Sequence, residues 1–225
     1  MDLNLRLQLR TVFADVLALP VEDDGVRFQG AALEIGPIRE GQQHGGVRVL
    51  MAGHVTTAKV RLQVDVGFGD AITPDAIEVE FPAPLAFPAP RLRAYPRETV
   101  VAEKLEAMVK LGLANSRMKD FYDLVILARM FVFEGDLLVR AIRATFQRRD
   151  TPLPNGLPVA LTSTFVGDAL KNTQWSAFVR ISDTPSAGDL AAAAATIVEF
   201  AEAPLAAAAS ATLLTARWLP GGPWR

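Results

Sequence analysis

Apolar and polar positions alternate in the first part of the chain and recur at helical spacing in the second. The run 58–66 alternates over nine residues, the period of a β-strand with one face buried. Its two faces are an apolar row and a polar row: Val60, Leu62, Val64 and Val66 against Lys59, Arg61, Gln63 and Asp65. Shorter runs at 26–28, 31–35 and 47–52 also predict strands, and residues 3–19 predict a helix.

A proline-rich stretch at 73–96 separates the two patterns and predicts an extended connection, because repeated proline blocks both helix and central strand. Beyond it the apolar positions have helical periodicity. The helices we expect lie at 99–113, 117–131, 137–147, 158–172 (either continuous or broken) and 174–181, with an alanine-rich tail at 190–216. We therefore predict an α+β protein with a sheet lobe over residues 1–93 and a helical lobe over residues 94–225.

Charged residues interrupt the apolar faces of two consecutive predicted helices. Lys104 has Val100, Val101 and Met108 as helical neighbours, whereas Glu106 and Lys110 belong to the polar face. A lysine on a packed face needs a partner or a substrate, because burying an unpaired ammonium group costs several kcal/mol. Lys104 is therefore a candidate site residue.

The second of these helices carries Asp120 and Asp123 on the face of two leucines, and we expect Ser116 to cap its start. Two interpretations stay open. In the structural one, Lys104 extends to solvent while Asp120 pairs with Arg117 and Asp123 with Lys119. In the functional one, these charges form a site. Asp65, at the end of a predicted strand, leaves the same two possibilities.

Composition restricts the classes of function. The net charge of −2 argues against a general nucleic-acid surface, so an RNA partner would need a local patch. The absence of cysteine excludes disulfides, thiolate zinc sites and cysteine nucleophiles. Glu199, Glu202 and Pro204 interrupt the apolar tail, and the N-terminus has no secretory pattern, so we expect no membrane span and a cytoplasmic location.

Two motifs resemble those of the AbiEii/AbiGii nucleotidyltransferase-like toxin family. They are Glu103-Lys104-Leu105 and, after it, the octapeptide that runs from Arg117 through Lys119, Asp120 and Asp123 to Leu124. Asp65, between hydrophobic strand residues, resembles the strand aspartate of the family. The resemblance extends from about residue 21 to about residue 180.

The resemblance implies a nucleotidyltransferase fold of the DNA polymerase β type, in a bacterial toxin–antitoxin or abortive-infection system. It implies Mg²⁺, a nucleoside triphosphate, an RNA acceptor such as tRNA, and a cognate antitoxin as partner. It makes Asp65, Lys104 and Asp120 catalytic residues and Asp65 a metal ligand. Lys104, Arg117 and Lys119 would bind substrate, and Glu103 and Asp123 would support them.

The family's opening motifs, a Gly-Gly or Gly-Ser turn followed by Asp-x-Asp, do not occur in this sequence. Asp2 is followed by Leu3-Asn4, and Gly45-Gly46 lies between two predicted strands rather than before a helix. We therefore expect a late start or a degenerate copy that is truncated or inactive. The alternative is a non-catalytic protein that binds a partner or itself, since an incomplete sheet exposes a strand edge.

Overall fold

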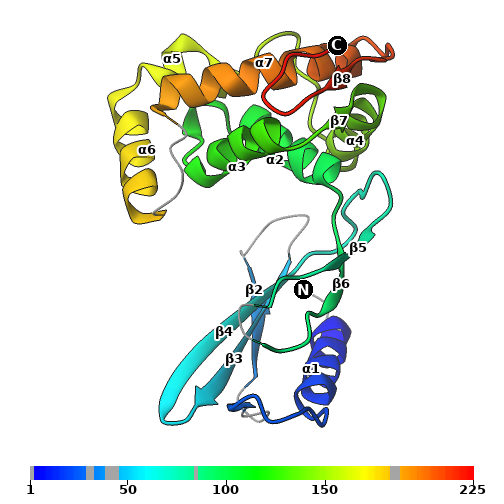
Figure 1. The fold of residues 1–225 in the computed structure, drawn as a ribbon, viewed down its shortest axis with the longest axis vertical. Helices are drawn as coiled ribbons and strands as arrows, with labels where there is room; N and C mark the ends of the chain where they lie inside the picture. Colours follow the sequence, from blue (N-terminus) through cyan, green and yellow to red (C-terminus); the bar gives the residue numbers. More distant parts are fainter. Residues whose placement is uncertain (1–2, 29–32, 39–45, 84–85, 183–187) are drawn as a thin grey trace. The chain divides into compact units, whose positions relative to one another are not determined.

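The computed structural model describes residues 3–28, 33–38, 46–83, 86–182 and 188–225 and has the α+β composition expected from the sequence (Figure 1). The chain divides into two compact units, Met1–Asp70 and Ala71–Arg225. The lobe boundary at residue 93 stays a prediction. Asp2, Gly45 and the first half of the strand expected at 31–35 lie outside the described residues.

The first unit contains the helix α1 (Leu3–Leu17) and an antiparallel sheet of four strands, β1 (Val26–Phe28), β2 (Glu34–Pro37), β3 (Val47–Val55) and β4 (Ala58–Val66). The central strand is β3. It pairs with β4 over nine residues, from Val47 opposite Val66 to Val55 opposite Ala58, and with β1 and β2 along its other edge. The expected helix at 3–19 and the strands at 26–28, 47–52 and 58–66 are thus confirmed.

The core of this unit lies between α1 and the middle of the sheet. Val49 and Met51 of β3 are buried, and they pack with Leu33 against Phe13 and neighbouring residues of α1. The apolar row of β4 lies beside this buried row in register, but its side chains stay exposed: Val60 by 40%, Leu62 by 37% and Val64 by 38%. The edge strand therefore keeps an uncovered apolar face within this unit.

The proline-rich connection is extended but contains two strands that we did not expect. The strands β5 (Ile77–Glu80) and β6 (Arg91–Ala94) pair antiparallel in the second unit. Every described proline of the stretch lies outside the two strands, so that none of them removes an N–H donor from the ladder. Proline content therefore marks the ends of these strands rather than excluding them.

The second unit is a helical bundle. Its elements are α2 (Arg97–Leu111), η2 (Gly112–Ala114), α3 (Met118–Met130), β7 (Phe133–Glu134), α4 (Gly135–Arg148), η3 (Val159–Leu161), α5 (Ser163–Val166), α6 (Ala169–Ser182), α7 (Leu190–Ala209) and β8 (Arg217–Trp218). Figure 1 shows α7 lying across α3 and α4, which contact it directly. The helix expected at 158–172 is broken into η3, α5 and the start of α6.

Aromatic residues close the core of the bundle at its C-terminal end. Trp218 is buried and its indole Nε1 donates a hydrogen bond to the carbonyl oxygen of Ala128, at 2.7 Å. Trp224 donates in the same way to Phe200, at 2.9 Å, and both tryptophan rings contact the Phe200 ring. The strand β8 pairs with β7. The last residues of the chain are thus an integral part of the bundle.

The helix α7 is long and apolar enough to cross a membrane by length and composition alone. Half of this apolar stretch is buried inside the bundle, where the side chains of Leu190, Ile197 and Phe200 are fully buried. The side chain of Asp189 caps its start by accepting a hydrogen bond from the Ala192 N–H, at 2.7 Å. This packing is that of a core helix, and a membrane protein is not indicated.

Candidate functional site

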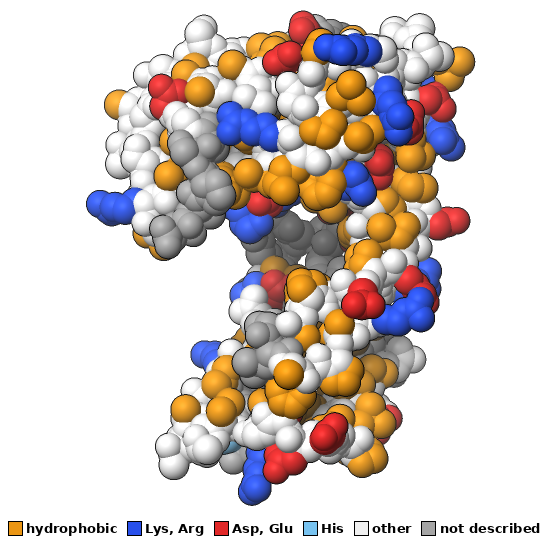
Figure 2. Space-filling view, viewed as in Figure 1, with side chains coloured by type: hydrophobic (Ala, Val, Ile, Leu, Met, Phe, Trp, Pro, Cys, Tyr) orange, Lys and Arg blue, Asp and Glu red, His pale blue; other side chains and the backbone are white. Residues whose placement is uncertain are grey.

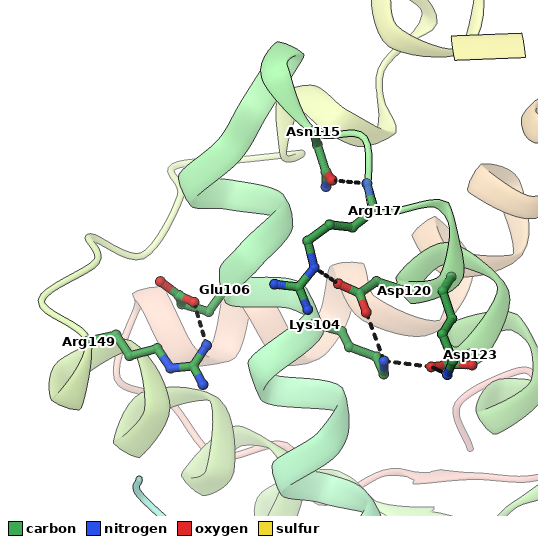
Figure 3. A network of polar contacts seen from close by, with 8 residues as sticks. Lys104, Glu106, Asn115, Arg117, Asp120, Asp123 and Arg149 are labelled. Carbon is green, nitrogen blue, oxygen red and sulfur yellow. Dashed lines mark hydrogen bonds and ion pairs between the residues drawn. The ribbon is translucent and has the colours of Figure 1, made fainter. Parts of the chain in front are cut away.

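Lys104 lies where α2 packs against α3 and links two carboxylates of α3 (Figure 3). Its ammonium group donates to Asp120 Oδ1 at 2.9 Å and to Asp123 Oδ2 at 2.7 Å. The side chains are 13% exposed for Lys104, 6% for Asp120 and 22% for Asp123. The lysine on the packed face therefore has partners, and these are the two carboxylates that stood out in the sequence.

Two exposed cations complete the cluster. Arg117 Nε lies 2.6 Å from Asp120 Oδ2, and Lys119 Nζ lies 2.6 Å from Asp123 Oδ2. Their side chains are 55% and 72% exposed. The two ion pairs expected in the structural interpretation, Arg117 with Asp120 and Lys119 with Asp123, are thus present. Lys104 contacts both carboxylates in addition. Three cationic and two anionic side chains leave one excess positive charge at this place, which favours an anionic ligand.

The carboxyl group of Asp123 is held in its ionised form. Partial burial raises its pKa, but hydrogen bonds from Lys104 and then Lys119 lower it more, so that the pKa lies below its ordinary value of 3.8. The carboxylate is therefore charged at neutral pH, and it keeps the Lys104 ammonium group in place.

Asn115, rather than Ser116, organises the turn that presents Arg117. The Asn115 side-chain oxygen accepts a hydrogen bond from the Arg117 N–H at 2.9 Å, and α3 begins without a side-chain cap. Asn115 is fully buried, and its carbonyl oxygen accepts a hydrogen bond from the buried Lys171 ammonium group at 2.8 Å. The expected Ser116 cap was wrong, because an asparagine two residues before the backbone N–H makes this turn instead.

An open pocket of 560 Å³ adjoins the cluster. It lies between the start of α3 and the middle of α6 and is lined by Ser116, Arg117, Met118, Lys119, Asp120, Gln174, Ala177 and Phe178. Two cations, one carboxylate and one aromatic ring thus face the same volume. We did not identify the contribution of α6 from the sequence, because Gln174 and Phe178 have no local signal that links them to Arg117.

Glu103 and Glu106 of α2 are directed to a different partner, Arg149. Glu106, expected on the solvent face, is only 2% exposed and accepts hydrogen bonds from Arg149 at 3.0 Å and Thr151 at 2.6 Å. Glu103 contacts the same guanidinium group at 2.5 Å. The expectation for Glu106 was wrong because Arg149, at the end of α4, covers that side of α2 (Figure 3).

Asp65 belongs to the first unit and is paired there. Its carboxylate accepts two hydrogen bonds from Arg48 on β3, both of 2.8 Å, and further ones from Gln63 at 3.2 and 3.3 Å. The Arg48 guanidinium holds the pKa of Asp65 below its ordinary value. The two arginine bonds join strands that already pair in the sheet, as a cross-strand ion pair does.

The carboxylates do not form a set of metal ligands. In the part of the chain that the structure describes, no three histidine, cysteine or acidic residues are grouped so that they could hold a metal ion. Asp65 pairs with an arginine, and the oxygens of Asp120 and Asp123 contact cationic side chains. These described carboxylates are therefore paired with cations and do not fit as ligands of the divalent metal that nucleotidyltransferases usually use.

Comparison with known proteins identifies the family. No curated protein sequence matches the chain. A family model described as "Nucleotidyl transferase AbiEii toxin, Type IV TA system" matches residues 3–196, from α1 into α7. The match includes the strand with Asp65 and the whole Lys104 cluster, so the family resemblance found in the sequence is confirmed. The chain therefore belongs to the nucleotidyl transferase AbiEii toxin family of type IV toxin–antitoxin systems.

Proposed function

We propose that the Lys104 cluster and its pocket bind the phosphates of a nucleoside triphosphate, as the helical half of a site that transfers a nucleotide to RNA, with tRNA as the acceptor. One observation carries the proposal: a nearly buried lysine, fixed by two carboxylates, beside a pocket with one excess positive charge. Membership of the family supports a nucleotide as substrate.

The cations of the cluster have different parts in this proposal. Arg117 and Lys119 are exposed and line the pocket, so they make the first contact with phosphate oxygens. Lys104 is held by its carboxylate partners at a fixed position, which favours electrostatic stabilisation of charge that develops during transfer. Asp120 orients Lys104 and Arg117 at once. No step is assigned to a metal, because the described donor set does not fit one.

Nucleotide titration calorimetry and a transfer assay test the proposal. The chain is titrated with each nucleoside triphosphate, with and without Mg²⁺, and incubated with labelled nucleotides and total RNA. We expect binding that is lost in the Arg117→Ala/Lys119→Ala double variant and weakened in Lys104→Met. The matched control is Lys110→Ala, on the same helix as Lys104 but 60% exposed. Equal binding by all variants would exclude the cluster as the phosphate site.

The second candidate function is a non-catalytic one, in which the chain binds a partner without transferring nucleotides. The pairing of Asp65 with Arg48 favours it, since a carboxylate held by an arginine is not free to act as a base or ligand. Nucleotide binding without any transfer to RNA would select a binding role. If the chain neither binds nucleotides nor transfers them, partner binding remains as its function.

The family implies an antitoxin partner for this chain. We place the protein in the cytoplasm, where nucleoside triphosphates and tRNA occur, and its lack of cysteine is compatible with a reducing compartment. Co-expression with the neighbouring gene, followed by affinity purification, tests the antitoxin. Recovery of the chain without a stoichiometric partner would contradict a stable protein complex.

A further inference from the structure

The outer edge of β4 has no strand partner in the part of the chain that the structure describes. Among the described residues β4 pairs with β3 alone, over all nine of its positions and without a break in register. Every second residue of such an edge strand directs its N–H and C=O groups away from the sheet, where they are ready to pair with another strand. β4 contains neither proline nor glycine, the residues that commonly interrupt an edge.

One face of this edge strand is apolar and uncovered within its unit. Val60, Leu62 and Val64 are each more than a third exposed, although they continue the row formed by the buried Val49 and Met51 of β3. Hydrophobic side chains are visible on the surface of this unit in Figure 2. An added strand next to β4 would bring a second apolar row against these side chains.

The sequence of β4 is complementary to itself when two copies run antiparallel. Full overlap of the nine residues places Leu62 opposite Leu62 of the second copy and Val60 opposite Val64. On the other face, Lys59 lies opposite Asp65 of the second copy, twice by symmetry. Arg61 lies opposite Gln63, so no like charges face each other in this register.

Neighbouring registers are less favourable. Side chains alternate between the two faces of a strand, so the apolar rows of both copies share one face only if the strands shift by two residues at a time. One such step places Arg61 opposite Arg61, where like charges repel. The step in the other direction pairs Arg61 with Asp65 but loses two residues of overlap. The longest overlap is thus also the register in which the ends of the strand attract.

We propose that β4 pairs antiparallel with β4 of a second copy of this chain, which joins two four-stranded sheets across a two-fold axis. Such an interface is isologous, since the same residues contribute from both copies. The proposal does not depend on the Lys104 site, which lies in the other unit.

Oligomeric state and cross-linking test the interface. Light scattering after gel filtration is expected to give twice the 24.3 kDa of one chain. Leu62→Lys, which places like charges on the two-fold axis, is expected to lose the dimer, and so is Lys59→Glu, which faces Asp65. The matched control is Leu213→Lys, at a leucine 75% exposed in the helical unit. A monomeric parent chain, or dimers in both β4 variants, would overturn the proposal.

The absence of native cysteine permits a test of the register itself. Oxidised Leu62→Cys is expected to give covalent dimers, because residue 62 faces itself. Val60→Cys and Val64→Cys, purified with tags of different size, are expected to cross-link with each other when mixed and hardly at all alone. Leu213→Cys measures cross-linking by random collision. Dimers that fail to cross-link at residue 62 would show that another surface forms the interface.

Discussion

Replacing Lys104 by methionine removes the charge that holds Asp120 and Asp123 together. Loss of one member of a buried ion pair typically costs ~3–5 kcal/mol. Asp120 keeps Arg117 at 2.6 Å and Asp123 keeps Lys119 at 2.6 Å, so neither carboxylate is left without a cation. We therefore expect the free energy of unfolding of Lys104→Met to fall by about 2–3 kcal/mol, at or below the low end of that range.

Lys119→Met is the matched control, because both lysines contact the same oxygen of Asp123. Lys119 is 72% exposed, so its removal should cost about 0–1 kcal/mol. Urea unfolding followed by tryptophan fluorescence measures both, since all three tryptophans lie in the helical unit. If Lys104→Met is as stable as the parent chain, or more stable, the lysine is only a tolerated buried charge and this reasoning fails.

Three further predictions concern acid sensitivity and packing. The pKa of Asp123 is lower in the folded state than its value of 3.8 in the unfolded chain. The ionised Asp123 carboxylate therefore stabilises the folded state above pH 3.8, and this stabilisation is lost as the pH falls through the pKa of the folded state. The difference in unfolding free energy between the parent and Asp123→Asn should therefore shrink below that pH; a constant difference down to pH 2 contradicts this. Glu106→Gln should cost about 1–3 kcal/mol in urea unfolding, because the buried Glu106 side chain loses the charge that it presents to Arg149, and an unchanged midpoint contradicts it. Gly135→Ala should cost about 1–3 kcal/mol by thermal unfolding, since the new Cβ would lie 2.5 Å from the Leu214 carbonyl oxygen; Gly36→Ala has open space and is the control, and equal melting temperatures would refute the clash.

Local periodicity predicted most of the elements. The nine-residue alternation at 58–66 gave a strand with the same bounds as β4, and the helix expected at 117–131 is α3. Lys104 was recognised because a charge at that helical position conflicts with its apolar neighbours. The partners Asp120 and Asp123 were found in the same way. These predictions depend only on residues a few positions apart, which is why one sequence sufficed.

Partners distant in the sequence could not be predicted. Glu106 has a position typical of a solvent-facing residue, and only Arg149, brought close by the packing of α4, makes it buried. Arg48 faces Asp65 through the register of a hairpin, which fixes which of several polar residues lie opposite. The proline pattern does not predict β5 and β6, because proline at the ends of a strand looks the same in the sequence as proline that prevents one.

Trp218 and Trp224 have a consequence for the order in which the helical unit acquires its structure. α2, α3 and α4 leave the ribosome first, yet the rings that cover Phe200 and Ala128 come from Trp218 and Trp224. At the usual rate of synthesis, the 70 residues from Arg148 to Trp218 take roughly 4–14 s. During that interval the aromatic core of the helical unit is not covered, so the unit completes its core only after Trp218 and Trp224 have been made. An antitoxin made in the same period would meet an incompletely folded chain.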